Sequence, residues 1–153
     1  MPRRPLSALL ALLLLAAAPA ASAAGLTVEG NIVAGPRTLT QAELDRLPQS
    51  EVTTTTSWTE GTETFRGASG QALMRSLGAA GTTVEAFASD GYSIEIPLAD
   101  FETTPLLIAK EMNGAPLPEG KGPLWIVYPY DAGYDAQEYV DRSVWALDRL
   151  IVK

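Results

Sequence analysis

Residues 106–129 read LLIAKEMNGAPLPEGKGPLWIVYP, and this segment carries the strongest indications of the fold in the chain. Its first half predicts a strand over Leu106–Met112, which the Asn113-Gly114 pair ends as a turn. The continuous apolar run Leu124–Tyr128 predicts a second strand, in a central position of a sheet. Strands that follow one another so closely, without long helices between them, favour antiparallel pairing.

The same pattern of short strands extends over the rest of the chain. The alternating segment Leu26–Ile32 is typical of an edge strand. Tyr134–Arg142 is predicted to be a polar connection without a strand. The further predicted strands are Val52–Trp58, Thr62–Arg66, Val84–Ala88, Tyr92–Ile96 and Trp145–Val152.

Two short helices are predicted from their capping residues. The capping box formed by Thr40–Glu43 begins a helix over Gln41–Leu47. Ser69 caps a second helix over Gly70–Leu77, which Gly78 ends. Clustered strands with a few short helices predict an α+β fold with a mostly antiparallel sheet.

The N-terminus has the three parts of an export signal. Residues 1–4 carry the two positive charges of Arg3 and Arg4, residues 6–18 are almost wholly apolar, and Ala21-Ser22-Ala23 offers a small-x-small cleavage site. We expect residues 1–24 to be a signal peptide and residues 25–153 to form one domain. The alternative is a retained anchor, although the apolar run is shorter than the roughly 20 residues that a spanning helix needs.

Export places the mature chain in the periplasm or outside the cell, with no membrane span left after cleavage. The leucine-rich core after Pro5 favours the general secretory route, which carries unfolded chains. The Arg3-Arg4 pair leaves the twin-arginine route, which carries folded proteins, as the alternative.

Composition excludes several kinds of chemistry. The chain has 11 basic and 18 acidic residues, and loss of Arg3 and Arg4 leaves the mature part with a net charge of about −9. Such a charge repels phosphate backbones, so nucleic acid is not an expected partner. The chain has no Cys and no His. Thiolate nucleophiles, Ser-His pairs and the usual zinc sites are therefore excluded.

The order of several motifs resembles the molybdopterin-binding domain of the sulfite oxidase-like oxidoreductases. The resemblance covers residues 38–153 and implies a mostly antiparallel mixed sheet or barrel with two or three short helices. It also implies molybdopterin as the cofactor. The motifs are Phe65-Arg-Gly67, the helix around Leu73, Asp90-Gly-Tyr92, residues 109–118 with Met-Asn-Gly-Ala-Pro-Leu-Pro, residues 122–129 with Gly-Pro-Leu, and Ser143-Val-Trp145.

The sequence departs from that family where the chemistry takes place. Catalytic members hold molybdenum through a cysteine after the strand that is here Val52–Trp58, and this chain has Ser57-Trp58-Thr59 instead. A serine hydroxyl stays protonated and is a harder ligand than a thiolate. Trp125 stands where the family favours arginine. We therefore expect no molybdenum and no catalytic residue.

Seven side chains are candidate ligand-binding residues. The aromatic and hydroxyl groups lie near strand ends, where sites are common, and the basic groups suit an anion. Core packing for the aromatic residues and surface ion pairs for the basic ones are the alternatives. The acidic loop of residues 131–141 lacks calcium-loop spacing, so no metal site is predicted. The candidates are Ser57, Trp58, Arg66, Tyr92, Lys110, Tyr130 and Arg142.

Three functions remain open from the sequence. The first is a non-catalytic domain that binds or senses a small molecule or a periplasmic protein, with a remnant pocket near Trp58. The second is a genuine molybdopterin-dependent oxidoreductase with oxygen-only ligation. The third is an interaction module that pairs with a partner through an exposed strand edge such as Leu26–Ile32.

Overall fold

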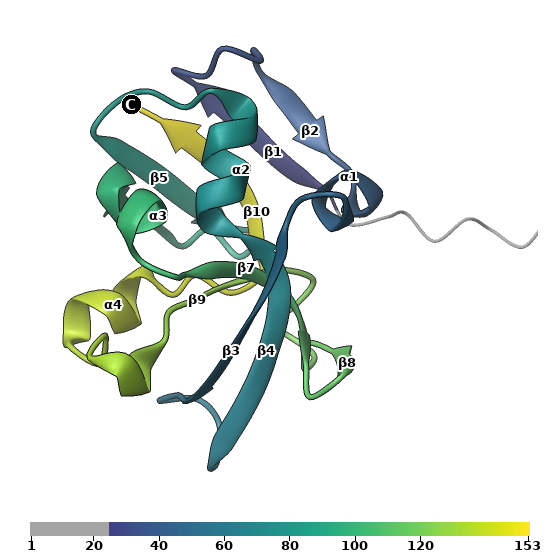
Figure 1. Cartoon of the computed structure of the whole chain (residues 1–153), viewed down its shortest axis with the longest axis vertical. Coiled ribbons are helices and arrows are strands. Elements are labelled where there is room, and N and C mark those ends of the chain that lie inside the picture. The colour runs from purple at the N-terminus through teal and green to yellow at the C-terminus, as the bar shows by residue number, and fades with distance from the viewer. Residues whose placement is uncertain (1–24) are drawn as a thin grey trace, which may run out of the picture.

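The computed structural model describes residues 25–153, which form two five-stranded sheets flanked by short helices (Figure 1). The predicted signal peptide lies outside the described residues. The first sheet contains, in spatial order, β2 (Arg37–Leu39), β1 (Leu26–Gly30), β10 (Leu147–Val152), β5 (Thr83–Ala88) and β6 (Ser93–Pro97). The second contains β3 (Gln49–Thr55), β4 (Thr62–Ser69), β7 (Leu107–Met112) and β8 (Ala115–Pro116), and β9 (Trp125–Val127) also pairs with β7.

The strand pairing confirms the predicted α+β fold. β1 and β10 run parallel, while the other pairings between named strands are antiparallel. The strands predicted over Val84–Ala88 and Tyr92–Ile96 are present as β5 and β6, which pair as an antiparallel hairpin around Ser89-Asp90-Gly91. Of the two forms expected, a mixed sheet or a barrel, the structure has mixed sheets that do not close into a barrel.

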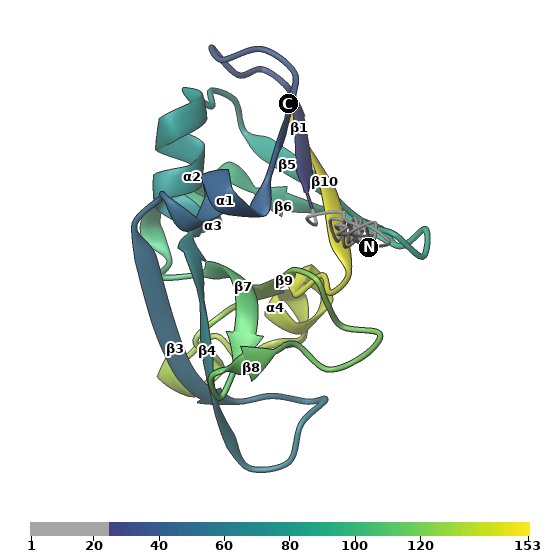
Figure 2. The same ribbon diagram turned by 90° about the vertical axis from the view of Figure 1, so that its right-hand side faces the viewer.

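Four α-helices occur in residues 25–153, against the two or three expected. They are α1 (Gln41–Asp45), α2 (Gly70–Leu77), α3 (Leu98–Thr103) and α4 (Gln137–Arg142), and a 3-10 helix, η1, spans Tyr130–Ala132. Helices α1, α2 and α3 lie on the same side of the first sheet, whereas α4 lies near β9 (Figure 2). Among these residues, none of the helices is long and apolar enough to cross a membrane.

The two helices that were predicted have the expected caps. The Thr40 hydroxyl accepts from Glu43 N at 3.2 Å, and the Glu43 carboxylate accepts from Thr40 N at 2.8 Å, which completes the capping box. In α2 the Ser69 hydroxyl accepts from Ala72 N at 3.3 Å. Gly78 ends α2 with φ at 62°, a left-handed conformation that glycine adopts without strain.

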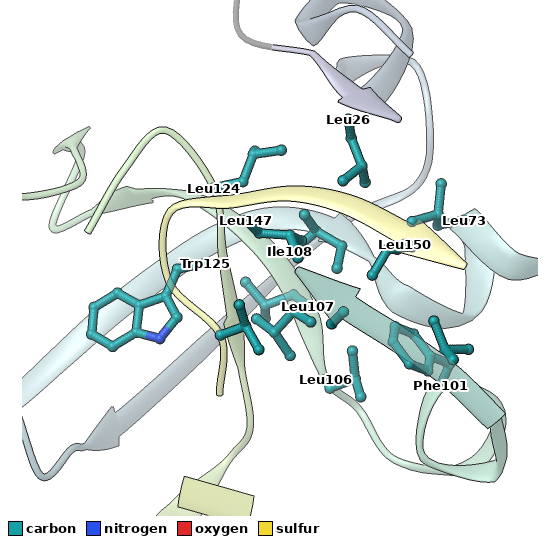
Figure 3. Close-up of a cluster of buried hydrophobic side chains, with 14 of the residues drawn as sticks. Leu26, Leu73, Phe101, Leu106, Leu107, Ile108, Leu124, Trp125, Leu147 and Leu150 are labelled. Atoms are coloured by element: carbon teal, nitrogen blue, oxygen red, sulfur yellow. The ribbon is translucent and has the colours of Figure 1, made fainter. Parts of the chain in front are cut away.

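One hydrophobic core joins both sheets and the helices that cover the first of them. Leu73 of α2, Phe101 of α3 and Leu150 of β10 are fully buried in it. Figure 3 shows that Trp125 lies apart from the leucines, at one end of this core. At this end of the core, aromatic side chains replace the packed aliphatic ones. The candidate site lies beside these aromatic residues.

Three further expectations about individual segments are wrong. Leu26–Ile32 is not an edge, because β1 pairs with β2 on one side and with β10 on the other. The run Leu124–Tyr128 is buried but not central, because β9 pairs with β7 and otherwise makes only the bridge between Trp125 and Trp145. Tyr134–Arg142 is not a plain connection, because α4 forms within it.

Candidate functional site

Trp58 lies in a cluster of aromatic rings at the end of the core. Its ring centroid is 5.0 Å from that of Trp145, 5.7 Å from that of Trp125 and 6.4 Å from that of Tyr130, all in edge-to-face geometry. This orientation places the positive edge of one ring against the negative face of the next. Trp125 is fully buried, whereas Trp58 and Trp145 are half-buried. The cluster thus has an inner, packed part and an outer part that reaches solvent.

The turn that carries Trp58 is fixed by hydrogen bonds to η1. The Asp131 carboxylate accepts from the backbone N of Thr55 at 2.8 Å and from its hydroxyl at 2.5 Å. The Thr54 hydroxyl accepts from Asp131 N at 3.0 Å, and the Thr56 hydroxyl accepts from Trp58 N at 3.1 Å. The two bonds from Thr55, the side-chain bond first, lower the pKa of Asp131. The end of β3 is therefore tied to a segment that follows β9.

A cleft of about 360 Å³ opens beside the outer rings of this cluster. Its volume falls within the range of roughly 300–1,000 Å³ that is usual for small-ligand sites. Most of its lining is apolar, and two carboxylates are the charged groups among its lining residues. The lining residues are Trp58, Ala88, Asp90, Tyr92, Gln137, Val140, Asp141, Ser143, Val144 and Trp145.

Tyr92 forms hydrogen bonds with both acidic residues that line the cleft, Asp90 and Asp141. Its backbone N donates to the Asp90 carboxylate at 3.0 Å, and its hydroxyl donates to the Asp141 carbonyl at 2.8 Å. Burial, and then the negative charge of Asp141, raises the pKa of the Tyr92 hydroxyl. Tyr92, which is 45% exposed, therefore connects the β5–β6 hairpin to the end of α4 and lines the cleft.

Helix α4 forms one wall of the cleft and is anchored from its other side. Asp100 of α3 accepts from the Tyr128 hydroxyl at 2.8 Å and from Arg142 at 3.1 Å. Arg142 also pairs with Glu138 at 3.3 Å. Burial and the charge of Asp100 raise the pKa of Tyr128 above its ordinary value. The guanidinium of Arg142 is thus occupied by two carboxylates and is not among the groups that line the cleft.

Tyr130 is buried behind the cleft and holds one of its lining residues, Ser143, in place. Its hydroxyl donates to the Ser143 hydroxyl, which in turn donates to the Tyr139 carbonyl at 2.7 Å. Burial raises the pKa of Tyr130 to about 12, so this hydroxyl stays protonated near neutral pH. Tyr130 therefore holds Ser143, a lining residue, in place and does not itself line the cleft.

The structure brings only part of the predicted site together. Trp58 and Tyr92 line the cleft. Ser57 is exposed in a neighbouring, smaller depression, which it lines together with Tyr130 and which shares Val140 with the cleft. Arg66 is exposed on β4 and lies outside the cleft lining. Lys110 pairs with Asp45 at 2.8 Å. The anion-binding contact that the basic residues suggested is therefore not formed at this cleft.

Sequence reasoning missed the wall that α4 supplies. Gln137, Val140 and Asp141 line the cleft from one face of this helix. The pairs Gln137–Asp141 and Glu138–Arg142, each four residues apart, bond along the helix at 2.7 Å and 3.3 Å. Their spacing was the available signal, since residues four apart are neighbours on a helix. Asp90, in the turn between β5 and β6, lines the cleft as well and was not among the candidate residues.

The comparisons with known proteins agree with this fold. The family model for the oxidoreductase molybdopterin binding domain matches residues 16–146. The solved structure of the sulfane dehydrogenase SoxCD from Paracoccus pantotrophus superposes with a TM-score of 0.68 at 18% sequence identity, over 84% of this chain. The match spans 38% of that dehydrogenase chain. The search of curated proteins finds no match.

Proposed function

This chain belongs to the oxidoreductase molybdopterin binding domain family, and from that premise we propose that it is an exported, non-catalytic binding domain that uses the cleft beside Trp58 without molybdenum. The single observation that carries the proposal is the place of Trp58. The resemblance places the metal ligand of catalytic members in the region after this strand, and in this chain that region carries an indole ring packed against three other aromatic rings.

The donor groups at this site do not fit a molybdenum centre. The chain has no cysteine to supply a thiolate, and Ser57 lines a neighbouring depression and not the cleft itself. The charged residues that line the cleft are Asp90 and Asp141. Carboxylates repel the phosphate of a pterin and the oxyanions that such enzymes handle. We therefore derive no reaction step through this cofactor.

The export signal supports the same proposal. A chain that crosses the membrane unfolded cannot carry a cofactor that was inserted in the cytoplasm. Its leucine-rich signal core favours that route. A periplasmic or secreted domain with a mostly apolar cleft is instead suited to capture a small molecule that is already outside the cytoplasm.

Elemental analysis of protein purified from its own host tests the absence of molybdenum. We expect far less than one molybdenum per chain and no pterin after denaturation. A content near one per chain, with pterin released on denaturation, would contradict the proposal and favour a genuine oxidoreductase.

A substitution that fills the cleft with a larger side chain tests whether a ligand binds there. Val140 of α4 is half-buried in the cleft wall, so Val140→Phe adds a ring to that space. Native mass spectrometry of the exported wild type is expected to find a small bound molecule, which the variant lacks although it stays folded. A variant that retains the molecule in full would show that binding occurs elsewhere.

A further inference from the structure

The charge of the cleft indicates which class of molecule it recognises. We propose that it binds a small organic cation, with an ammonium group on an apolar body, between the rings of Trp58, Trp145 and Tyr92 and the carboxylates of Asp90 and Asp141. This inference rests on the proposed binding function and names its ligand class.

The aromatic side chains supply the first part of the argument. Three of the lining residues carry aromatic rings, and the faces of such rings attract cations through their quadrupole. One of these rings already binds a cation within the protein. The Nζ of Lys121, which is not a lining residue, lies 4.1 Å from the centroid of Trp145. The environment of this cluster therefore tolerates a positive charge against a ring.

The carboxylates supply the second part. Neither Asp90 nor Asp141 has a salt-bridge partner within residues 25–153. Their side-chain hydrogen bonds come from uncharged donors, namely Tyr92 N at 3.0 Å and Gln137 Nε2 at 2.7 Å. Arg142, the residue next to Asp141, is held by Asp100 and Glu138. Two negative charges at the rim are thus left without a cationic side chain to balance them.

The charge of the whole mature chain acts in the same direction. With nine basic and 18 acidic residues after residue 24, its field concentrates cations and excludes anions. An anionic ligand would meet both rim carboxylates and this field. A neutral ligand would gain only the apolar contacts, so a cation of the same shape is expected to bind more tightly.

Three probes of nearly equal shape separate charge from apolar contact: choline, the neutral 3,3-dimethyl-1-butanol and the anionic 3,3-dimethylbutanoate. The chain contains three tryptophans, and all of them belong to the cluster beside the cleft. Tryptophan fluorescence therefore reports binding there directly. We expect choline to bind about tenfold more tightly than the alcohol, a difference of about 1.4 kcal/mol, and the carboxylate to bind most weakly.

Variants that remove charge but keep hydrogen bonds test the role of the rim. In the double variant Asp90→Asn, Asp141→Asn each side chain retains an oxygen that can accept its present bond. We expect the preference for choline over the alcohol to fall to within about twofold. Asp148→Asn, which removes an exposed carboxylate outside the cleft, is the matched control and is expected to keep the full preference.

Each outcome of these titrations is decisive. A choline preference that disappears only in the double variant supports the inference. Equal binding of choline and the alcohol overturns the cation inference and leaves the proposed binding function standing. No binding of any probe in the millimolar range overturns both, because a ligand cleft of this size should accept at least one of them.

Discussion

Replacing Trp58 by alanine removes the ring on which both the aromatic cluster and the cleft depend. Full burial of a tryptophan would make this substitution cost about 3–5 kcal/mol. Trp58 is only half-buried, which lowers this cost, while its edge-to-face contacts with Trp125, Trp145 and Tyr130 keep the cost well above that of a surface residue. We therefore expect the free energy of unfolding to fall by about 2–3 kcal/mol.

Thermal and urea unfolding of the mature chain measure this loss. With an unfolding entropy of about 2.1 cal/mol/K per residue, a domain of this size loses roughly 7–11 °C of melting temperature for that change. Val33→Ala is the control, because Val33 is 89% exposed and its truncation should stay within about 0.5 kcal/mol. Trp58→Phe keeps a ring and is expected to lose less stability than Trp58→Ala.

The result also separates two roles of Trp58. A loss above about 4 kcal/mol would mean that the side chain is a core plug, and loss of binding would then follow from unfolding. A loss below about 1 kcal/mol would refute the ring packing described here. Within the expected range, ligand binding measured well below the melting temperature shows whether Trp58 also contacts the ligand.

Three further predictions concern export and the supports of the site. Mass spectrometry of the exported protein should show cleavage just after Ala21-Ser22-Ala23, and an intact N-terminus would contradict the signal-peptide prediction. The pKa of Asp131 is lowered from 3.8 by its bonds to the end of β3, so its contribution to stability is present at neutral pH and is lost as the pH falls below about 4. Asp131→Asn should therefore lower the free energy of unfolding in urea more at pH 7 than at pH 3. The control Asp135→Asn should show no such difference. Equal losses for Asp131→Asn at both pH values would refute the assignment. Tyr128→Phe removes a buried hydroxyl that donates to Asp100, and we expect the free energy of unfolding to fall by about 1–2 kcal/mol. A change under about 0.5 kcal/mol would count against the anchoring of α4.

Local sequence signals determined much of the fold. The capping box at Thr40, the Ser69 cap and the left-handed Gly78 are each fixed by neighbours within four residues, so they could be predicted from the sequence. The hairpin around Ser89-Asp90-Gly91 is equally local. The order of motifs also identified the family before any strand was placed in space.

Strand neighbours could not be predicted in this way. The alternation in Leu26–Ile32 shows that one face is buried, but it does not show which strands lie beside it. β1 gains β10 as a parallel partner from the far end of the chain, and this pairing turns an expected edge into an interior strand. Hydrogen bonding between strands is a backbone property, so the side-chain pattern carries little information about it.

The candidate site shows the same division. From the sequence it was known that the chain has no cysteine or histidine, that Trp58 follows the β3 region, and that acidic residues outnumber basic ones. Only the tertiary structure decided that Trp58 meets Trp125 and Trp145, and that α4 brings Asp141 to the same cleft as Asp90. Composition fixes which chemical groups a chain can offer, because it needs no geometry. Which of them act together depends on contacts between segments far apart in the sequence, and these form only when the core packs.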